Sequence, residues 1–167
     1  MHGEIIKWKP ELQNNKVWNS YSDFERIIVK GIYPVHPLTT LVLSILSDYM
    51  QKRSPLILMA LLYDQIKDDN LSEVWNENLI FPTAVIDSSF FDEVLKAEDD
   101  RRVHSSICTS YDELLRNSRL QNQLKNNDKS VLQAIVLFKL CKFKVSSRLD
   151  LLKSYHYFTG IALSDVE

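Results

Sequence analysis

The side chains that most often build metal and catalytic sites are scattered along this chain. The histidines are His2, His36, His104 and His156. None of them stands at a metal-binding spacing from an Asp, a Glu or a Cys. Cys108 and Cys141 lie in apolar or helical stretches without a CxxC motif, which argues against zinc and against a disulfide framework. We therefore expect no metal site, and we expect the ring of His36, between two prolines, to make a structural bond to a helix end.

An acidic cluster is the nearest approach to a catalytic pair of carboxylates. Glu98, Asp99 and Asp100 stand beside Arg101 and Arg102. Adjacent residues on a helix do not converge on one point, so a solvated helix end is favoured over a site for acid and base catalysis. The chain also lacks the GxSxG, HExxH and GxxxxGK[ST] motifs. We predict that it is not an enzyme and binds no cofactor by itself.

Basic residues gather near the C-terminal end of the sequence, where they alternate with aromatic residues. The candidates for contact with nucleic acid are Lys142, Lys144, Arg148 and Lys153. Such a cluster is typical of a surface that binds phosphates. Lysines on the outer face of amphipathic helices also keep a domain soluble, and this second interpretation stays open. The net charge of −2 provides no overall basic field, so any contact with DNA would have to be local.

The composition favours helices. Three Gly and five Pro in 167 residues are too few for a fold rich in tight turns, and the 45% of apolar residues is enough for a core. We expect an all-α protein, built as an irregular helical bundle. The sequence starts without the pattern of a signal peptide, and its most apolar run, Leu56 to Tyr63, is far shorter than a bilayer requires. A cytoplasmic protein with no membrane partner is the expectation.

Three parts are expected along the chain: a polar N-terminal arm over residues 1–20, a helical domain over 21–127, and a helix-turn-helix-like segment over 128–167. Ser22 and Glu25 have the spacing of a capping box, and Gly31 is placed to end that helix in a left-handed cap. Pro37 is expected to be the first residue of an apolar helix.

Further elements follow from similar signals. Ser54 is expected to cap a helix in which Leu56 to Tyr63 is apolar on every side, and this should be the central buried helix. A brief strand is expected around Thr83 to Ile86, followed by a helix capped by Asp87 or Ser88. Another helix is expected from Ser105 to about Asn117.

The C-terminal segment has the order of elements found in a helix-turn-helix. A helix from Asp128 to Phe143 is followed by a helix over 147–158, a turn at Gly160 and a last helix capped by Ser164. The buried positions of the first of these helices are expected to be Val131, Leu132, Ile135, Val136, Phe138 and Leu140. Because a helix of one turn is not stable alone, we expect the segment to be truncated.

One stretch, residues 31–62, resembles the helical lid of large bacterial P-loop ATPases of the AAA+ or STAND-like type, many of which belong to phage-defence systems. The matching phrase comprises Gly31, Tyr33, Pro34, His36, Pro37, Leu38 and Thr39, and Arg53 with Ser54 matches the opening of the next lid helix. The C-terminal part resembles the winged-helix segment that follows the lid. The resemblance implies that Arg53 senses nucleotide, and that ATP and Mg²⁺ are held by a core elsewhere in the parent ATPase.

Two hypotheses for function follow. The first is a non-catalytic lid and coupling module of a larger ATPase, whose partners are the rest of that ATPase, another protein, or DNA. The second is a free-standing helical domain that binds another protein. A P-loop in the same reading frame would distinguish the first from the second.

Overall fold

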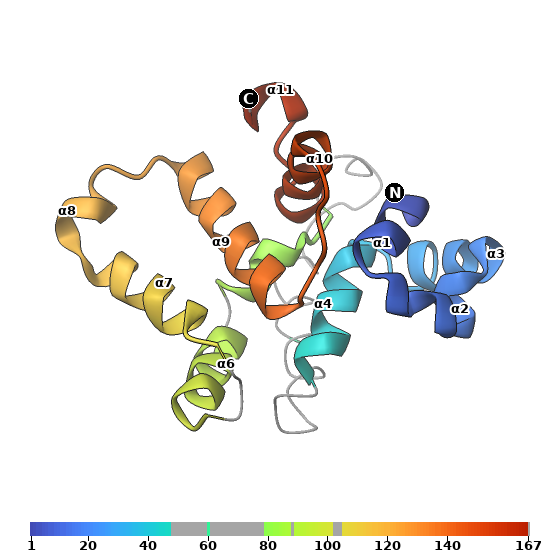
Figure 1. Cartoon of the computed structure of the whole chain (residues 1–167), viewed down its shortest axis with the longest axis horizontal. Coiled ribbons are helices and arrows are strands. Elements are labelled where there is room, and N and C mark those ends of the chain that lie inside the picture. Colours follow the sequence, from blue (N-terminus) through green and yellow to red (C-terminus); the bar gives the residue numbers. More distant parts are fainter. Residues whose placement is uncertain (48–59, 61–78, 88, 102–104, 167) are drawn as a thin grey trace.

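The computed structural model describes residues 1–47, 60, 79–87, 89–101 and 105–166, and the all-α class is confirmed (Figure 1). Its elements are α1 (His2–Trp8), the 3-10 helix η1 (Pro10–Asn14), α2 (Lys16–Asn19), α3 (Tyr21–Asp23), the π-helix η2 (Phe24–Val29), α4 (Pro37–Ser47), the 3-10 helix η4 (Pro82–Val85), α6 (Ser89–Asp99), α7 (Ile107–Arg116), α8 (Ser118–Gln121), α9 (Asn126–Leu140), α10 (Arg148–Thr159) and α11 (Leu163–Val166). None of these described helices is long and apolar enough to cross a bilayer.

Three side chains of the first twenty residues belong to the core, so the segment is not wholly the polar arm that was expected. Ile5 and Trp8 on α1 are fully buried, and Trp18 on α2 is buried as well. The carbonyl of Trp8 accepts a hydrogen bond from the backbone N–H of Lys144 at 2.8 Å. These helices are so short that each carries only one or two buried side chains. No helical period is therefore visible in the sequence.

The helix after residue 20 starts and ends differently from the prediction. Ser20, not Ser22, is its N-cap, and its hydroxyl accepts from the Asp23 N–H at 3.4 Å. Gly31 does not adopt the left-handed conformation, so the predicted cap is wrong. Glycine is needed there because a Cβ would lie 2.4 Å from the carbonyl oxygen of Ile27.

Helix α4 begins at Pro37, as predicted, and runs through the middle of the fold (Figure 1). Leu38, Leu41, Val42 and Leu46 are buried, and Ile45 is half-buried. The expected central helix over Leu56 to Tyr63 lies outside the described residues except for Ala60. Among the described residues, the largest fully buried side chains are Trp8, Phe24, Phe158, Ile5, Leu38, Leu46 and Leu137.

The strand predicted around Thr83 to Ile86 is wrong, because Pro82 to Val85 form a 3-10 helix. Pro82 has no N–H for a ladder, and the N–H groups of Ala84 and Ile86 bond to the carbonyls of Phe81 and Thr83. The extended pairing seen in the described part is a parallel bridge between Val35 and Ile80. Helix η4 packs against α4, α9 and α10, and so lies between the two halves of the chain.

Helices α6 and α7 occupy the predicted places, and α7, α8 and α9 form an arch at one side of the molecule (Figure 1). Helix α9 begins at Asn126, earlier than predicted, because the carboxylate of Asp128 accepts from the Lys125 N–H at 3.0 Å. Its buried face also differs. Val131, Leu132, Ile135 and Phe138 are only half-buried. Val136 and Leu140 are buried, as predicted, and the helix also buries Gln133, Ala134 and Leu137.

The C-terminal segment contains the predicted helix, glycine turn and short helix. Ser147 caps α10, and Gly160 ends it with a φ of 74°. A Cβ at Gly160 would lie 2.5 Å from the ring of Phe81. Helix α11 begins at Leu163, so Ser164 lies inside the helix and the predicted cap at this residue is wrong. The assignment of the segment as a helix-turn-helix or winged helix stays a prediction.

Candidate functional site

The segment from Gly31 to Thr39, which carries the resemblance, leads into α4. It is hydrogen-bonded to Ile80. The Ile80 N–H donates to the Pro34 carbonyl at 3.0 Å, and the Ile80 carbonyl accepts from the His36 N–H at 3.1 Å. The same carbonyl accepts from the Thr39 hydroxyl at 2.6 Å. These three hydrogen bonds form a junction that holds residues 79–81 against the start of α4. The Tyr33–Pro34 peptide bond, just before this junction, is cis.

The buried imidazole of His36 lies at the centre of this junction. Its Nδ1 accepts from the Leu38 N–H at 3.2 Å, so the structural bond to a helix end is confirmed. The ring stacks on Phe81 at 5.2 Å and on Tyr157 of α10 at 6.3 Å, measured between ring centroids. Burial, and then the nearby His156, lower the pKa of His36 to about 4. The ring is therefore neutral at pH 7 and connects α4 to α10 by packing.

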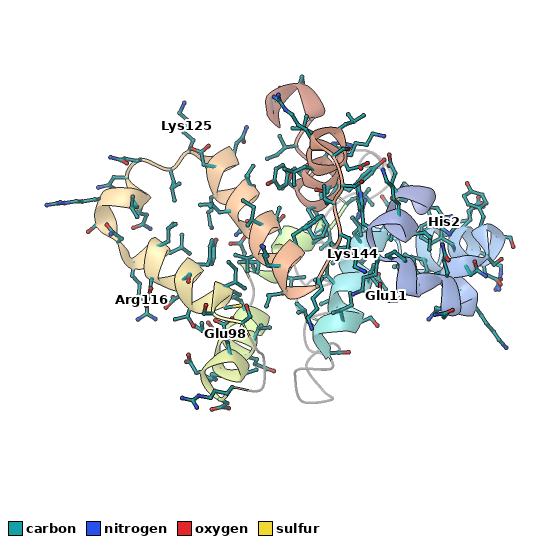
Figure 2. The ribbon with its side chains drawn as sticks, viewed as in Figure 1. His2, Glu11, Glu98, Arg116, Lys125 and Lys144 are labelled. Atoms are coloured by element: carbon teal, nitrogen blue, oxygen red, sulfur yellow. The ribbon has the colours of Figure 1, made fainter. Side chains whose placement is uncertain are left out.

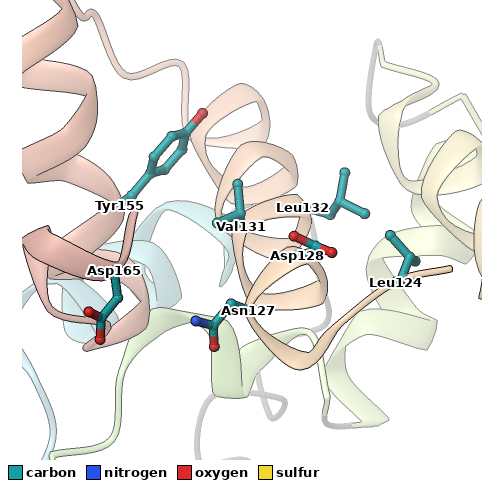
Figure 3. A pocket seen from close by; sticks show the side chains of 7 residues that line it. All are labelled: Leu124, Asn127, Asp128, Val131, Leu132, Tyr155 and Asp165. Carbon is teal, nitrogen blue, oxygen red and sulfur yellow. The ribbon is translucent and has the colours of Figure 1, made fainter. Parts of the chain in front are cut away.

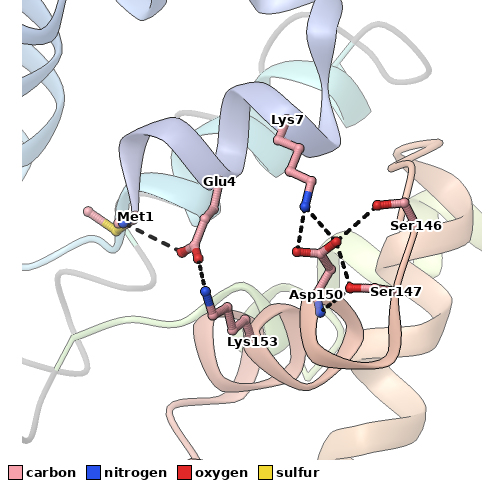
Figure 4. Close-up of polar contacts among 7 residues, drawn as sticks. All are labelled: Met1, Glu4, Lys7, Ser146, Ser147, Asp150 and Lys153. Carbon is pink, nitrogen blue, oxygen red and sulfur yellow. Dashed lines mark hydrogen bonds and ion pairs between the residues drawn. The ribbon is translucent and has the colours of Figure 1, made fainter.

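A layer of ion pairs joins α1 to α10 (Figure 4). The carboxylate of Asp150 accepts from the Lys7 ammonium at 2.7 Å and from the hydroxyls of Ser147 at 2.9 Å and Ser146 at 3.0 Å. These donors, led by Lys7, lower the pKa of Asp150 to about 2. On the next turn of α10, Lys153 pairs with Glu4 and lowers the pKa of the Glu4 carboxyl.

Sequence reasoning missed this layer. One signal for it exists, because Ser147 and Asp150 have the spacing of an N-cap residue and its acidic partner at the third helical position. The pairing with α1 has no signal in the sequence, since Lys7 and Asp150 are 143 positions apart.

The four basic candidates divide into two groups. Lys142 and Lys144 are exposed in the link from α9 to α10, and Arg148 is exposed at the first position of α10 (Figure 2, where Lys144 is labelled). No ion pair with another described residue holds these three side chains. Lys153 is half-buried and is held by Glu4. The structure therefore leaves three of the four cations available to a phosphate or a carboxylate of a partner.

One member of the acidic cluster, Glu98, caps a helix, which corrects the expectation that the whole cluster is solvated. Glu98 is buried, and its carboxylate accepts from the Thr109 N–H at 2.7 Å, the Thr109 hydroxyl at 2.8 Å and the Cys108 N–H at 3.3 Å. It satisfies the N–H groups of the second and third residues of α7, where the N-cap Ser106 makes no side-chain bond. Asp99 and Asp100 are exposed, as expected. Glu98 therefore joins α6 to the start of α7.

The thiols and the remaining polar side chains offer little to a metal. Burial is the main cause that raises the pKa of Cys108 and of Cys141, each to about 12, so both are protonated at neutral pH. A thiol must lose its proton to act as a metal ligand or nucleophile. Within the described ranges, no group of three or more His, Cys, Asp and Glu side chains could hold a metal ion.

Arg53 and Ser54, the second part of the resemblance, lie outside the described residues. Their assignments as nucleotide sensor and helix cap stay predictions. Comparisons of the chain with known protein families, with characterised proteins and with solved structures found no match.

Proposed function

We propose that this chain is a non-catalytic helical lid and coupling module of a larger P-loop ATPase. In this proposal the Arg53 end responds to nucleotide, and the C-terminal helices pass the response to a partner protein or to DNA. The sequence support is the phrase from Gly31 to Thr39 together with Arg53 and Ser54. The physical support for a coupling role comes from the packing of the described helices.

The observation that carries the proposal is the stacking of His36 between α4, the 79–81 segment and α10. His36 is the residue immediately before α4, Phe81 precedes η4, and Tyr157 lies on the last turn of α10. A side chain packed on two other elements cannot shift without displacing them, because protein interiors are close-packed. Movement of α4 would therefore be transmitted directly to α10.

The response to nucleotide is assigned to Arg53 on chemical grounds. A guanidinium at the start of a lid helix can donate two parallel hydrogen bonds to a phosphate, and Ser54 would cap the same helix. ATP and Mg²⁺ would be bound by the core of the parent ATPase. The purified chain is accordingly expected to show no ATP hydrolysis above a buffer blank.

The output is assigned to Lys142, Lys144 and Arg148. Two of these exposed cations lie in the link that leads into α10, and Arg148 is the first residue of that helix. Contacts to phosphates release counterions and therefore weaken as salt is added. Binding to the carboxylates of a partner protein would also weaken as salt is added, but the binding constant would fall less steeply with salt concentration. A salt titration of the bound complex therefore distinguishes DNA from protein as the partner.

The test places Arg53→Ala in the native polypeptide that contains this chain, identified by tagging the gene and measuring its intact mass. Removal of one charge-stabilising donor is expected to lower the rate of ATP hydrolysis by about 10²-fold to 10³-fold, with little change in melting temperature. Lys52→Ala, which removes the adjacent positive charge, is the matched control and should leave the rate within about twofold. A native polypeptide without a P-loop would refute the proposal, and would favour a free-standing domain that binds another protein.

A further inference from the structure

A groove of about 380 Å³ opens between the beginning of α9, α10 and α11 (Figure 3). It is lined by Leu124, Asn127, Asp128, Val131, Leu132, Tyr155 and Asp165. The picture shows Val131 and Leu132 on α9, with Tyr155 facing them from one side and Leu124 from the other. The four apolar or aromatic residues are each half-buried, so the groove leaves part of their surface in contact with water.

The charged side chains at this groove are all negative. Asp128 and Asp165 are exposed, and each accepts a hydrogen bond from a residue close to it in the sequence, Lys125 N–H at 3.0 Å and the Ser164 hydroxyl at 3.0 Å respectively. Within the described part of the chain, neither carboxylate forms an ion pair. Asp150, by contrast, is paired with Lys7. The groove thus has apolar walls and a negative rim that is not neutralised.

We infer that this groove binds an amphipathic helix of a partner protein, with apolar residues on one face and lysine or arginine at the edge of that face. Apolar side chains spaced by one helical turn would cover Val131, Leu132 and the ring of Tyr155. The flanking cations would lie near Asp128 on α9 and Asp165 on α11. The inference does not depend on the proposed lid function, because it uses a different surface and requires no nucleotide.

The size and polarity of the groove favour a helix over a small metabolite. A volume of about 380 Å³ holds a few aliphatic side chains, and it lies at the lower end of the range for pockets that enclose a small ligand. Such pockets also bury most of the surface of their ligand, whereas the apolar and aromatic residues of this groove each stay partly exposed.

The experiment uses the full chain and two fluorescein-labelled peptides of about four helical turns. Both peptides carry leucines at the same i, i+3, i+4 and i+7 positions, and they differ only in having lysines or glutamates at the two edges of the leucine face. Fluorescence anisotropy should show the lysine peptide binding at least about tenfold more tightly than the glutamate peptide. Each exposed charge pair contributes only modestly, but two pairs change from attraction to repulsion, and the four modest contributions add up. Equal affinities for the two peptides would overturn the assignment.

Variants of the chain locate the binding. Asp128→Asn with Asp165→Asn keeps the hydrogen-bond acceptors and should weaken the lysine peptide by about 3-fold to 10-fold. Asp99→Asn, which removes an exposed carboxylate from α6, is the matched control and should leave the affinity for the lysine peptide unchanged. Leu132→Ala should weaken both peptides. Because that change could also loosen α9, Leu124→Ala in the preceding loop provides a second apolar variant.

Two further results would overturn the inference. The first is an affinity that is unchanged by all of these groove variants. The second is a concentration-dependent dimer in sedimentation velocity that Leu132→Ala abolishes, because it would show that a second copy of this chain occupies the groove. The inference is supported if the chain binds the lysine peptide more tightly than the glutamate peptide, and if the groove variants weaken this binding while Asp99→Asn does not.

Discussion

Replacing Trp8 with Ala tests whether the N-terminal helix belongs to the core. The Trp8 side chain is fully buried, its ring lies 5.8 Å from that of Tyr157, and its carbonyl holds the Lys144 N–H. Truncation of a buried Trp to Ala costs about 3–5 kcal/mol. The indole N–H is buried without a hydrogen-bond partner in the described structure, so its removal returns about 1 kcal/mol of that cost. The expected loss is therefore about 2–4 kcal/mol of unfolding free energy.

For a chain of this length, 1 kcal/mol corresponds to about 2–4 °C in melting temperature, so Trp8→Ala should melt roughly 5–15 °C lower. The assay is thermal and urea unfolding followed by circular dichroism, with the urea m-value checked for an unchanged transition. Trp8→Phe retains most of the apolar area and has no N–H, so it should lose less than about 1.5 kcal/mol. Leu12→Ala, half-buried in η1, should lose about 1 kcal/mol. A Trp8→Ala loss no larger than that of Leu12→Ala would refute the packing of α1 described here.

Three further predictions concern groups whose environment the fold determines. The Asp150 pKa is lowered from 3.8 to about 2, so the stability that its carboxylate contributes is present above about pH 4 and is lost as the pH falls toward 2; the melting temperatures of Asp150→Asn and wild type should differ at pH 7 and converge near pH 2. The His36 pKa is lowered from 6.5 to about 4, so protonation of this ring favours unfolding. As the pH falls from 6.5 to 4, the unfolding free energy of wild type should fall by up to about 3 kcal/mol relative to that of His36→Asn. Parallel pH profiles of the two unfolding free energies would contradict this. Glu98→Ala should lose about 1–2 kcal/mol because the first N–H groups of α7 lose their acceptor, whereas Asp99→Ala on the same turn should lose less than about 0.5 kcal/mol, as urea unfolding would measure.

Several local features were predictable because the cause lies within a few residues of the chain. Pro37 begins α4 since its fixed φ suits the first helical position and its missing N–H is not needed there. Gly160 ends α10 since the left-handed conformation disfavours a Cβ. The His36 bond to Leu38 N–H also spans only two residues. The all-α class followed from composition, which reflects the same local preferences.

The tertiary structure decided the features that depend on residues far apart in the sequence. Ile5 and Trp8 appear isolated in a polar stretch, and they become core residues because the link after α9 passes over α1. Glu98 looked like one of several surface carboxylates until the turn into α7 brought the N–H groups of Cys108 and Thr109 to it. Gly31 has the position of a left-handed cap, yet it is required by the close approach of the Ile27 carbonyl.

The candidate sites divide in the same way. The sequence selected Lys142, Lys144, Arg148 and Lys153, because basic residues gather there among aromatic residues within a short stretch of the chain. Only the packing of α1 on α10 separated Lys153 from the others, since Glu4 reaches it from the opposite end of the chain. The groove between α9, α10 and α11 had no sequence signal, because its walls come from separate helices and its shape exists only once they are packed.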